Sequence, residues 1–275
     1  MNKMEFENFH NETCQVFIVK IGGSISTNKD GEYELNYENI ERIAQVIRGE
    51  KIWECCKLIL VFGGGSFGNL APKEYDLECR TLYSNNCHLS KMTTIMFSML
   101  SEITDVLTRN KVPVYPFQCS ALVNQLSSGE WNLQVDSIFS ALSQGLIPVI
   151  SGDLVFNNDG GFSIFSSDNI PELIAKKSIV EHVLYYSDVE GFYVDSSTNH
   201  IERHIVRNEI DSYMHLAGPS SRQDVTGGMR NKLLQIKKLL DLNISAELLS
   251  FNKFSDLSLS LNRKIRLGTY FAPGE

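Results

Sequence analysis

The chain has 275 residues, 43% of them hydrophobic, enough to bury a large core in one α/β domain or in two lobes that share a sheet. The formal net charge of −8 argues against nucleic acid as a partner, because binding the phosphate backbone needs clustered positive surface. The cysteines show no CxxC or disulfide-framework spacing, no basic-then-apolar leader is visible, and no apolar run is as long as a membrane span. We therefore expect a cytoplasmic protein with reduced thiols and no membrane partner.

The first expected strand covers residues 15–20 and ends at Lys20, directly before Gly22-Gly23-Ser24, which we expect to turn the chain. Lys29 follows in a polar loop. Apolar residues then recur at helical spacing over residues 37–47, which predicts a helix that faces the core. The segment is thus predicted to be a strand, a glycine turn and a helix, with two lysines beside the turn.

A second glycine loop follows the buried strand expected over residues 58–62. Gly63, Gly64 and Gly65 permit positive φ and let backbone amides approach a ligand without a Cβ in the way. Such amides ahead of a helix suit a phosphate. The loop also fits the Gly-x-Gly-x-x-Gly dinucleotide pattern, which ends at Gly68, and the nucleophile elbow of hydrolases, centred on Ser66. Three chemistries are therefore open at this loop.

The rest of the chain alternates between strands and helices, so the fold class is α/β with a largely parallel sheet. Residues 75–88 are polar, and we expect a loop or short helix there at the rim of a pocket. Expected helices cover residues 90–109, 135–144 and 231–242, expected strands cover residues 112–117, 146–151, 183–187, 245–249 and 267–271, and residues 154–156 and 162–165 form a hairpin.

Two of the three chemistries leave residues unexplained. The dinucleotide pattern needs an acidic residue about 20 positions after its loop, and the loop should follow the first strand; neither holds here. The hydrolase alternative would pair Ser66 with Asp188 and with one of three histidines, but it does not account for the turn after Lys20. We keep it as a minor alternative. The candidate histidines are His200, His204 and His215.

Phosphoryl transfer explains more of the sequence, because it requires cations and amides around the moving oxygens and a carboxylate that holds the cations in place. Lys20 ends a strand beside a glycine turn, and Lys232 follows Gly227-Gly228. Asp168 lies where a helix is expected to begin and can position the lysines, while Glu172 is expected on a solvated helix face. No Walker A motif is present, so a kinase of this sequence is not of the P-loop kind.

The motifs stand in the order typical of the amino acid kinase superfamily, which the chain resembles from about residue 17 to residue 270. Within it, the chain is most similar to the branch of the isopentenyl phosphate kinases and fosfomycin resistance kinases. The motifs are Val19-Lys20-Ile21-Gly22-Gly23-Ser24, Gly63-Gly64-Gly65-Ser66-Phe67-Gly68, Ser151-Gly152-Asp153, Ser187-Asp188-Val189-Glu190-Gly191, and Asp224-Val225-Thr226-Gly227-Gly228-Met229 followed by Lys232.

The resemblance implies one domain, an open three-layer α/β/α sandwich with an acceptor lobe to about residue 150 and a nucleotide lobe over residues 151–275. It implies a homodimer that uses ATP with Mg²⁺ and phosphorylates a small phosphate or phosphonate, with no metal ligand expected from the protein. Phosphoryl transfer would depend on Lys20, Lys29, Asp168 and Lys232; ATP would also contact Gly22, Gly23, Ser187, Asp188, Gly191, Gly227 and Gly228; the acceptor would contact Gly63, Gly64, Gly65, Gly68, Asn69, Gly152 and Asp153. Free amides would come from Gly22, Gly23, Gly63 and Gly64.

One position departs from the resemblance. Kinases of phosphates and phosphonates in this branch normally have His directly after the second glycine loop, whereas this chain has Asn69. Asn donates a hydrogen bond without a charge and so stabilises a dianionic acceptor less. Three explanations stay open: a different phosphonate or a carboxylate acceptor, replacement of the lost contact by Lys73 or His88, or a nucleotide-binding regulator that has lost turnover.

Overall fold

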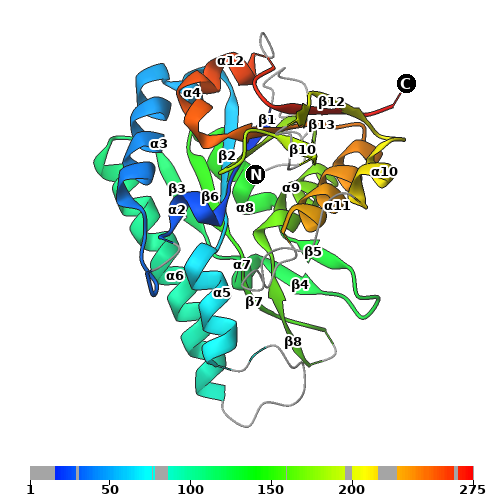
Figure 1. Cartoon of the computed structure of the whole chain (residues 1–275). Coiled ribbons are helices and arrows are strands. Elements are labelled where there is room, and N and C mark those ends of the chain that lie inside the picture. The colour runs from blue at the N-terminus through cyan, green and yellow to red at the C-terminus, as the bar shows by residue number, and fades with distance from the viewer. Residues whose placement is uncertain are drawn as a thin grey trace, which may run out of the picture.

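The protein is described from a computed structural model, which covers residues 16–28, 31–75, 77, 86–158, 160–195, 200–215, 228–262 and 266–274. An eight-stranded sheet with the order β12-β14-β13-β9-β1-β2-β6-β3 runs through its centre (Figure 1). All neighbours in it pair parallel except β13 and β14. The strands are β1 (Val16–Ile21), β2 (Lys57–Phe62), β3 (Val114–Phe117), β6 (Ile147–Ser151), β9 (Val180–Ser187), β12 (His204–Val206), β13 (Ser245–Ser250) and β14 (Thr269–Ala272).

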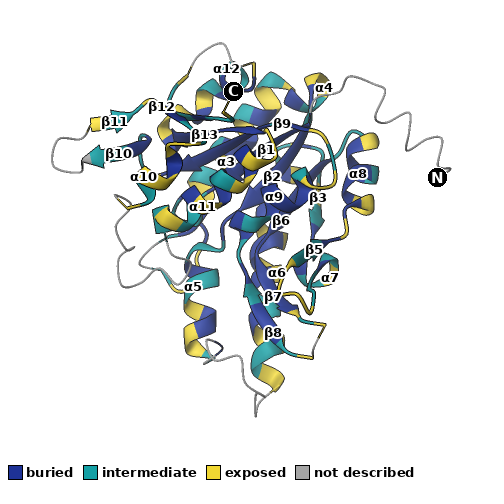
Figure 2. Ribbon diagram, turned by 90° about the vertical axis from the view of Figure 1, so that its right-hand side faces the viewer, coloured by how far each residue is buried: buried dark blue, intermediate teal, exposed yellow. Residues whose placement is uncertain are grey.

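Helices cover both faces of this sheet (Figures 1 and 2), which confirms the three-layer α/β/α sandwich. On β1, Val19 and Ile21 join the core on one face and Ile18 joins the core on the other. Because successive side chains of a strand point to opposite faces, Lys20 points to the same face as Ile18. The first face carries α3 (Tyr37–Glu50), α6 (Asn86–Arg109) and α12 (Leu257–Leu261); the second carries α8 (Asp136–Ser143), α9 (Ile170–Ala175) and α11 (Gly228–Asp241).

Smaller elements surround the sheet. The hairpins β4–β5 and β7–β8 and the helix α5 extend beyond one end of the strands in Figures 1 and 2. They and the remaining elements are α2 (Gly23–Ser26), α4 (Ile52–Cys55), α5 (Gly65–Glu74), α7 (Cys119–Leu122), β4 (Val123–Gln125), β5 (Trp131–Leu133), β7 (Asp153–Phe156), β8 (Phe162–Phe165), η1 (Ser167–Asn169), β10 (Phe192–Asp195), β11 (His200–Glu202), α10 (Ile210–Met214) and η2 (Phe251–Asp256).

The strands, helices and hairpin expected from the sequence are confirmed, with bounds that shift by a few residues. The helix expected from residue 90 begins one turn earlier, at Asn86, and Gly23 opens the short helix α2 where only a turn is expected. Residues 76 and 78–85 of the expected rim segment lie outside the described residues. No helix in the described part of the chain is long and apolar enough to cross a membrane.

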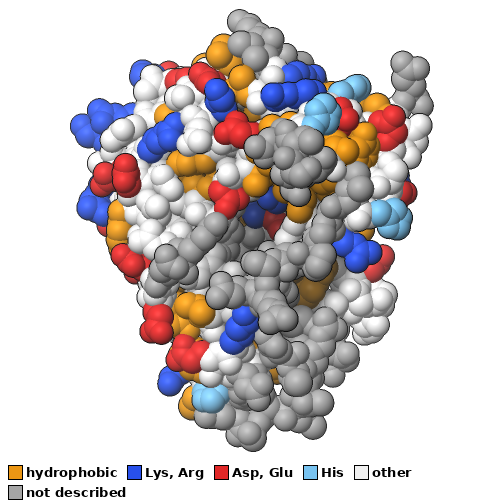
Figure 3. Space-filling view, in the orientation of Figure 1, with side chains coloured by type: hydrophobic (Ala, Val, Ile, Leu, Met, Phe, Trp, Pro, Cys, Tyr) orange, Lys and Arg blue, Asp and Glu red, His pale blue; other side chains and the backbone are white. Residues whose placement is uncertain are grey.

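Acidic and basic side chains are interspersed over the face shown in Figure 3. Among the described residues visible on it, neither sign of charge forms an extended patch. On this face, anion binding therefore has to be sought in individually placed groups.

Candidate active site

The candidate site lies at the carboxyl ends of the central strands. From β1 the chain continues to β2 on one side and later returns to β9 on the other, so the order of strands reverses between β1 and β9. In open α/β sheets, ligands bind outside the carboxyl ends of the strands at such a reversal. Lys20 lies near the end of β1, and Ser187 is the last residue of β9.

A buried ion pair joins Lys20 to Asp168. Lys20 Nζ lies 2.5 Å from Asp168 Oδ1, and their side chains are only 6% and 12% exposed. Asp168 comes from η1, where its N–H donates to the Ser166 hydroxyl, so Ser166 is the helix cap and the carboxylate of Asp168 is left for the lysine. The two residues are far apart in sequence, and the structure brings them together.

Lys232 approaches the same carboxylate from α11. Burial tends to raise the pKa of Asp168, but the positive charges of Lys20 and Lys232 outweigh it and hold that pKa below its ordinary value. Lys232 Nζ also donates a hydrogen bond to Ser187 Oγ at 3.4 Å, and Ser187 Oγ donates to Asp188 Oδ1 at 3.3 Å. Two ammonium groups, a carboxylate and a hydroxyl from four elements thus gather at one point.

The two glycine turns lie against each other beside this cluster. A Cβ on Gly23 would lie 2.3 Å from the amide nitrogen of Gly65, and one on Gly63 would lie 2.4 Å from that of Gly23. No side chain larger than hydrogen fits at these contacts without moving the backbone. Glycine is therefore required at these positions so that the backbones of the two turns can lie in contact with each other.

Not all of the expected amides are free. Gly22 N–H donates to Tyr186 O at 2.9 Å, and Gly63 N–H donates to Ile21 O at 2.8 Å. These amides extend the hydrogen bonding of the sheet, so the expectation that Gly22 and Gly63 supply free amides is wrong. The amides that donate to no described residue belong to Gly23, Gly64 and Gly65.

Gly152 and Asp153 support the segment that carries Asp168. A Cβ on Gly152 would lie 2.5 Å from Phe165 O and 3.0 Å from Ser167 N, so the turn after β6 packs directly on the approach to η1. The carboxylate of Asp153 accepts hydrogen bonds from the amides of Leu154, at 2.8 Å, and Ser120, at 3.3 Å. Burial raises the pKa of Asp153, and these hydrogen bonds oppose the rise. Its contact with an acceptor stays a prediction.

The remaining predicted residues are spread around this centre. Gly191 packs against Thr269. Gly228 opens α11 with a φ of +56°, and Gly68 and Asn69 lie half-buried on α5. Lys29 and Gly227 lie outside the described residues.

The two proposed substitutes for the missing His differ in their distance from Asn69, and Lys73, four residues on in the same helix, is the nearer one. Lys73 is exposed one helical turn further along α5. The ring of His88 packs 5.2 Å from that of Tyr75, which caps the far end of α5, about 9 Å from Asn69 along the helix axis.

No hydrolase triad forms among the described residues. Ser66 is buried, and its hydroxyl makes no hydrogen bond in the part of the chain that is described. His204 stacks on Tyr270 at 5.7 Å on the edge strand β12, five strands from β2, or roughly 24 Å at the usual strand spacing. Its separation from Ser66 removes one of the candidate bases for the hydrolase alternative.

Glu172 is buried, so its expected position on a solvated helix face is wrong, and the contacts of Thr27 were not expected from the sequence. Glu172 is 5% exposed and pairs with Lys176 at 2.5 Å and with Lys238 of α11 at 3.6 Å, because α11 packs over α9. Thr27 hydrogen-bonds to both glycine turns. No local pattern signals the contact of Glu172 with Lys238 or that of Thr27 with Ser66 N–H, since each partner belongs to a segment distant in sequence.

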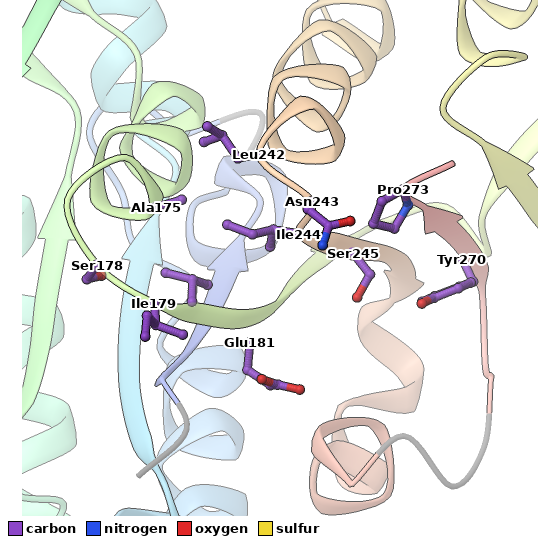
Figure 4. A pocket seen from close by; sticks show the side chains of 11 residues that line it. Ala175, Ser178, Ile179, Glu181, Leu242, Asn243, Ile244, Ser245, Tyr270 and Pro273 are labelled. Carbon is purple, nitrogen blue, oxygen red and sulfur yellow. The ribbon is translucent and has the colours of Figure 1, made fainter. Parts of the chain in front are cut away.

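A separate pocket of about 550 Å³ lies at the opposite ends of the strands (Figure 4). Its lining includes Val180 and Ser245, the first residues of β9 and β13, together with Ile179 and Tyr270. Because Lys20 and Ser187 lie toward the other ends of the strands, this pocket is not part of the candidate site.

The chain is similar to known proteins in sequence and in fold. A sequence model of the amino acid kinase family matches residues 15–250. The chain is 31% identical over 230 residues to the isopentenyl phosphate kinase of Methanocaldococcus jannaschii, covering 80% of this chain and 86% of that protein. It is 26% identical over 245 residues to the isopentenyl phosphate kinase of Methanothermobacter thermautotrophicus, and the match covers 86% of this chain and 91% of that protein.

Solved structures of isopentenyl phosphate kinases share the fold. One of them matches with a TM-score of 0.76 at 23% identity, and the match covers 93% of this chain and 100% of the chain in that structure. A structure of the isopentenyl phosphate kinase substrate complex matches with a TM-score of 0.73 at 20% identity, and the match covers 94% of this chain and 99% of the chain in that structure. At these identities the structural likeness establishes the architecture alone.

Proposed function

Because this chain belongs to the amino acid kinase family, we propose that it is an ATP-dependent kinase that phosphorylates a small phosphate, with isopentenyl phosphate as the favoured acceptor. The observation that carries the proposal is the cluster of Lys20, Asp168 and Lys232 at the carboxyl edge of the sheet. Two ammonium groups around one carboxylate leave a net positive charge, which suits a polyphosphate.

In the proposed reaction, an oxygen of the acceptor attacks the γ-phosphorus in line and ADP departs with the bridging oxygen. Lys20 and Lys232 neutralise charge on the transferring group while Asp168 holds them in place, and the free amides of the glycine turns add hydrogen bonds. A phosphate acceptor is already ionised, so no general base and no covalent intermediate are needed.

Mg²⁺ fits this site as a companion of ATP. Among the described residues, no group of three or more His, Cys, Asp or Glu is placed to hold a metal, and Asp168 is engaged by Lys20. The ion would be held mostly by phosphate oxygens and water, where it adds to charge neutralisation.

The rest of the site is assigned by lobe. The part up to about residue 150 would bind the acceptor, with Gly64, Gly65 and Asn69 nearest to it, and the part from residue 151 would bind ATP, with Ser187 and Asp188 near the nucleotide. Lys29 and Gly227 would complete the phosphate contacts. A homodimer, which the resemblance implies, is tested by light scattering.

Asn69 favours a second acceptor class. Its side chain is uncharged where the branch normally has His, which favours a carboxylate as the alternative acceptor. A phosphonate such as fosfomycin is a further alternative, because the chain also resembles the fosfomycin resistance kinases. The same substitution motivates the alternative of a different class, a regulator that binds ATP without turnover.

The experiment is ADP release from ATP and Mg²⁺ with isopentenyl phosphate, fosfomycin and small carboxylates, each tested alone. Turnover with isopentenyl phosphate is expected to be the fastest. Turnover confined to another class reassigns the acceptor, and ATP binding without turnover on any acceptor supports the regulator. Labelling of Ser66 by a fluorophosphonate would instead support the hydrolase.

A further inference from the structure

The two glycine turns need a device that fixes their spacing. Gly23 belongs to the turn after β1, and Gly64 and Gly65 belong to the turn after β2. The amides of all three donate to no described residue, although the turns touch. If these amides are to bind one phosphate group, the distance between the turns has to be held to a fraction of an ångström.

We propose that Thr27 is the positioning residue that locks the two glycine turns into a single anion-binding cradle. Thr27 is 2% exposed. Its hydroxyl donates to Gly23 O at 2.9 Å and accepts from Ser66 N–H at 3.0 Å, so one oxygen atom bridges the two turns. This inference rests on the proposed function, because the cradle is taken to hold the γ-phosphate of ATP, the group that is transferred, at the place where it meets the acceptor beside Gly64 and Gly65.

The Thr27 hydroxyl also fits the backbone of the second turn. Gly65 has a φ of +51°, and a Cβ there would lie 2.0 Å from Thr27 Oγ1. The hydroxyl therefore occupies the space that only a glycine leaves open. By accepting from Ser66 N–H, Thr27 satisfies the third amide of this turn and leaves those of Gly64 and Gly65 for a ligand.

The backbone of Thr27 is held independently of its side chain. Its N–H donates to Gly23 O at 3.0 Å, and its main chain forms an antiparallel bridge with Leu35. Replacing the hydroxyl by a methyl group is therefore expected to alter the link between the turns while this segment keeps its path.

The test compares Thr27→Val, which removes the hydroxyl at nearly constant shape, with Thr27→Ser, which keeps it. Thr104→Val is the matched control, because the hydroxyl of Thr104 donates to Leu100 O, at 2.7 Å, within its own helix α6 and bridges no second segment among the described residues. Each variant is assayed for kcat and KM with ATP and isopentenyl phosphate, for the Kd of ATP by calorimetry, and for Tm.

Thr27→Val is expected to lower kcat about 10–100-fold and to raise the Kd of ATP about 5–10-fold, with a smaller rise in the KM for isopentenyl phosphate, which Asn69 would also contact. Thr27→Ser and Thr104→Val are expected to stay within about 3-fold of the parent protein in each constant. If Thr27 contributed to folding alone, Thr27→Val would lower Tm without raising the Kd of ATP more than the KM for isopentenyl phosphate.

Wild-type kcat and ATP affinity in Thr27→Val would overturn the inference. If that variant does not fold, Thr27→Ala, which places no methyl group over Gly65, is compared with Thr27→Ser in its stead. A parent protein that binds ATP but phosphorylates no acceptor refutes the proposed function alone. In that case the Kd of ATP in the same variants still tests whether Thr27 positions the two glycine turns.

Discussion

Replacing Asp168 by Asn probes the centre of the site most sharply, because it removes one charge and keeps the shape. The Lys20–Asp168 pair is almost fully buried at 2.5 Å. Removing one partner of a buried ion pair costs about 3–5 kcal/mol, since the other charge stays buried without compensation. For a chain of this length that lowers Tm by on the order of 10 °C.

The same change is expected to separate binding from catalysis. The cluster of Lys20, Lys232 and Asp168 carries a net charge of about +1 with the carboxylate and about +2 without it, so ATP should bind Asp168→Asn at least as tightly as the parent protein. Turnover should nevertheless fall at least about 100-fold, because the lysines are no longer held in place. Calorimetry gives the affinity and ADP release gives the rate.

The pH dependence of this effect has a defined sign. Because the pKa of Asp168 is held below its ordinary value in the folded protein, the carboxylate contributes stability above its unfolded pKa of about 3.9 and loses it as the pH falls further. The difference in unfolding free energy between the parent protein and Asp168→Asn should therefore shrink below about pH 4.

The exposed Asp136, at the start of α8, gives a matched control, and Asp136→Asn should change stability by less than about 1 kcal/mol. An Asp168→Asn protein with the Tm and turnover of the parent protein would refute the reasoning.

Further predictions concern three other side chains. Lys232→Met should lower kcat about 100-fold with little loss of Tm, because the residue is only half-buried; unchanged ADP release would contradict its role. Asn69→His should lower the KM for isopentenyl phosphate roughly 3–10-fold through a charge-assisted hydrogen bond, and an unchanged KM counts against that acceptor contact. Burial raises the pKa of Glu247, whose carboxylate accepts from the amides of Leu267 and Gly268. Glu247→Gln should therefore gain stability relative to the parent protein as the pH rises from about 4, as measured by urea unfolding from pH 4 to 8, and parallel pH profiles would argue against this.

Much of the site could be predicted because its signals are local. A strand that ends at Lys20 before two glycines fixes which edge of the sheet the ammonium group occupies, and strand alternation fixes which face it points to. The second glycine loop repeats this arrangement on the neighbouring strand, and parallel pairing brings the two turns together. Motif order therefore sufficed for the fold and for the gathering of the lysines.

The errors and omissions arise from contacts between distant segments. Gly22 and Gly63 look like their glycine neighbours in sequence, yet their amides are taken up by carbonyl groups of β9 and β1. In sequence, Glu172 has the pattern of a solvated position on α9, but α11 packs over α9 and places Lys238 beside its carboxylate. Thr27 resembles any loop threonine, and only the packing of α2 against α5 shows what its hydroxyl bridges.

The central claim is that Lys20 and Lys232 act on one triphosphate. A crystal structure with Mg²⁺ and a non-hydrolysable ATP analogue tests it most directly. The account predicts both Nζ atoms within about 3.2 Å of phosphate oxygens of the same nucleotide, with Asp168 still beside Lys20. A triphosphate bound away from either lysine would contradict it.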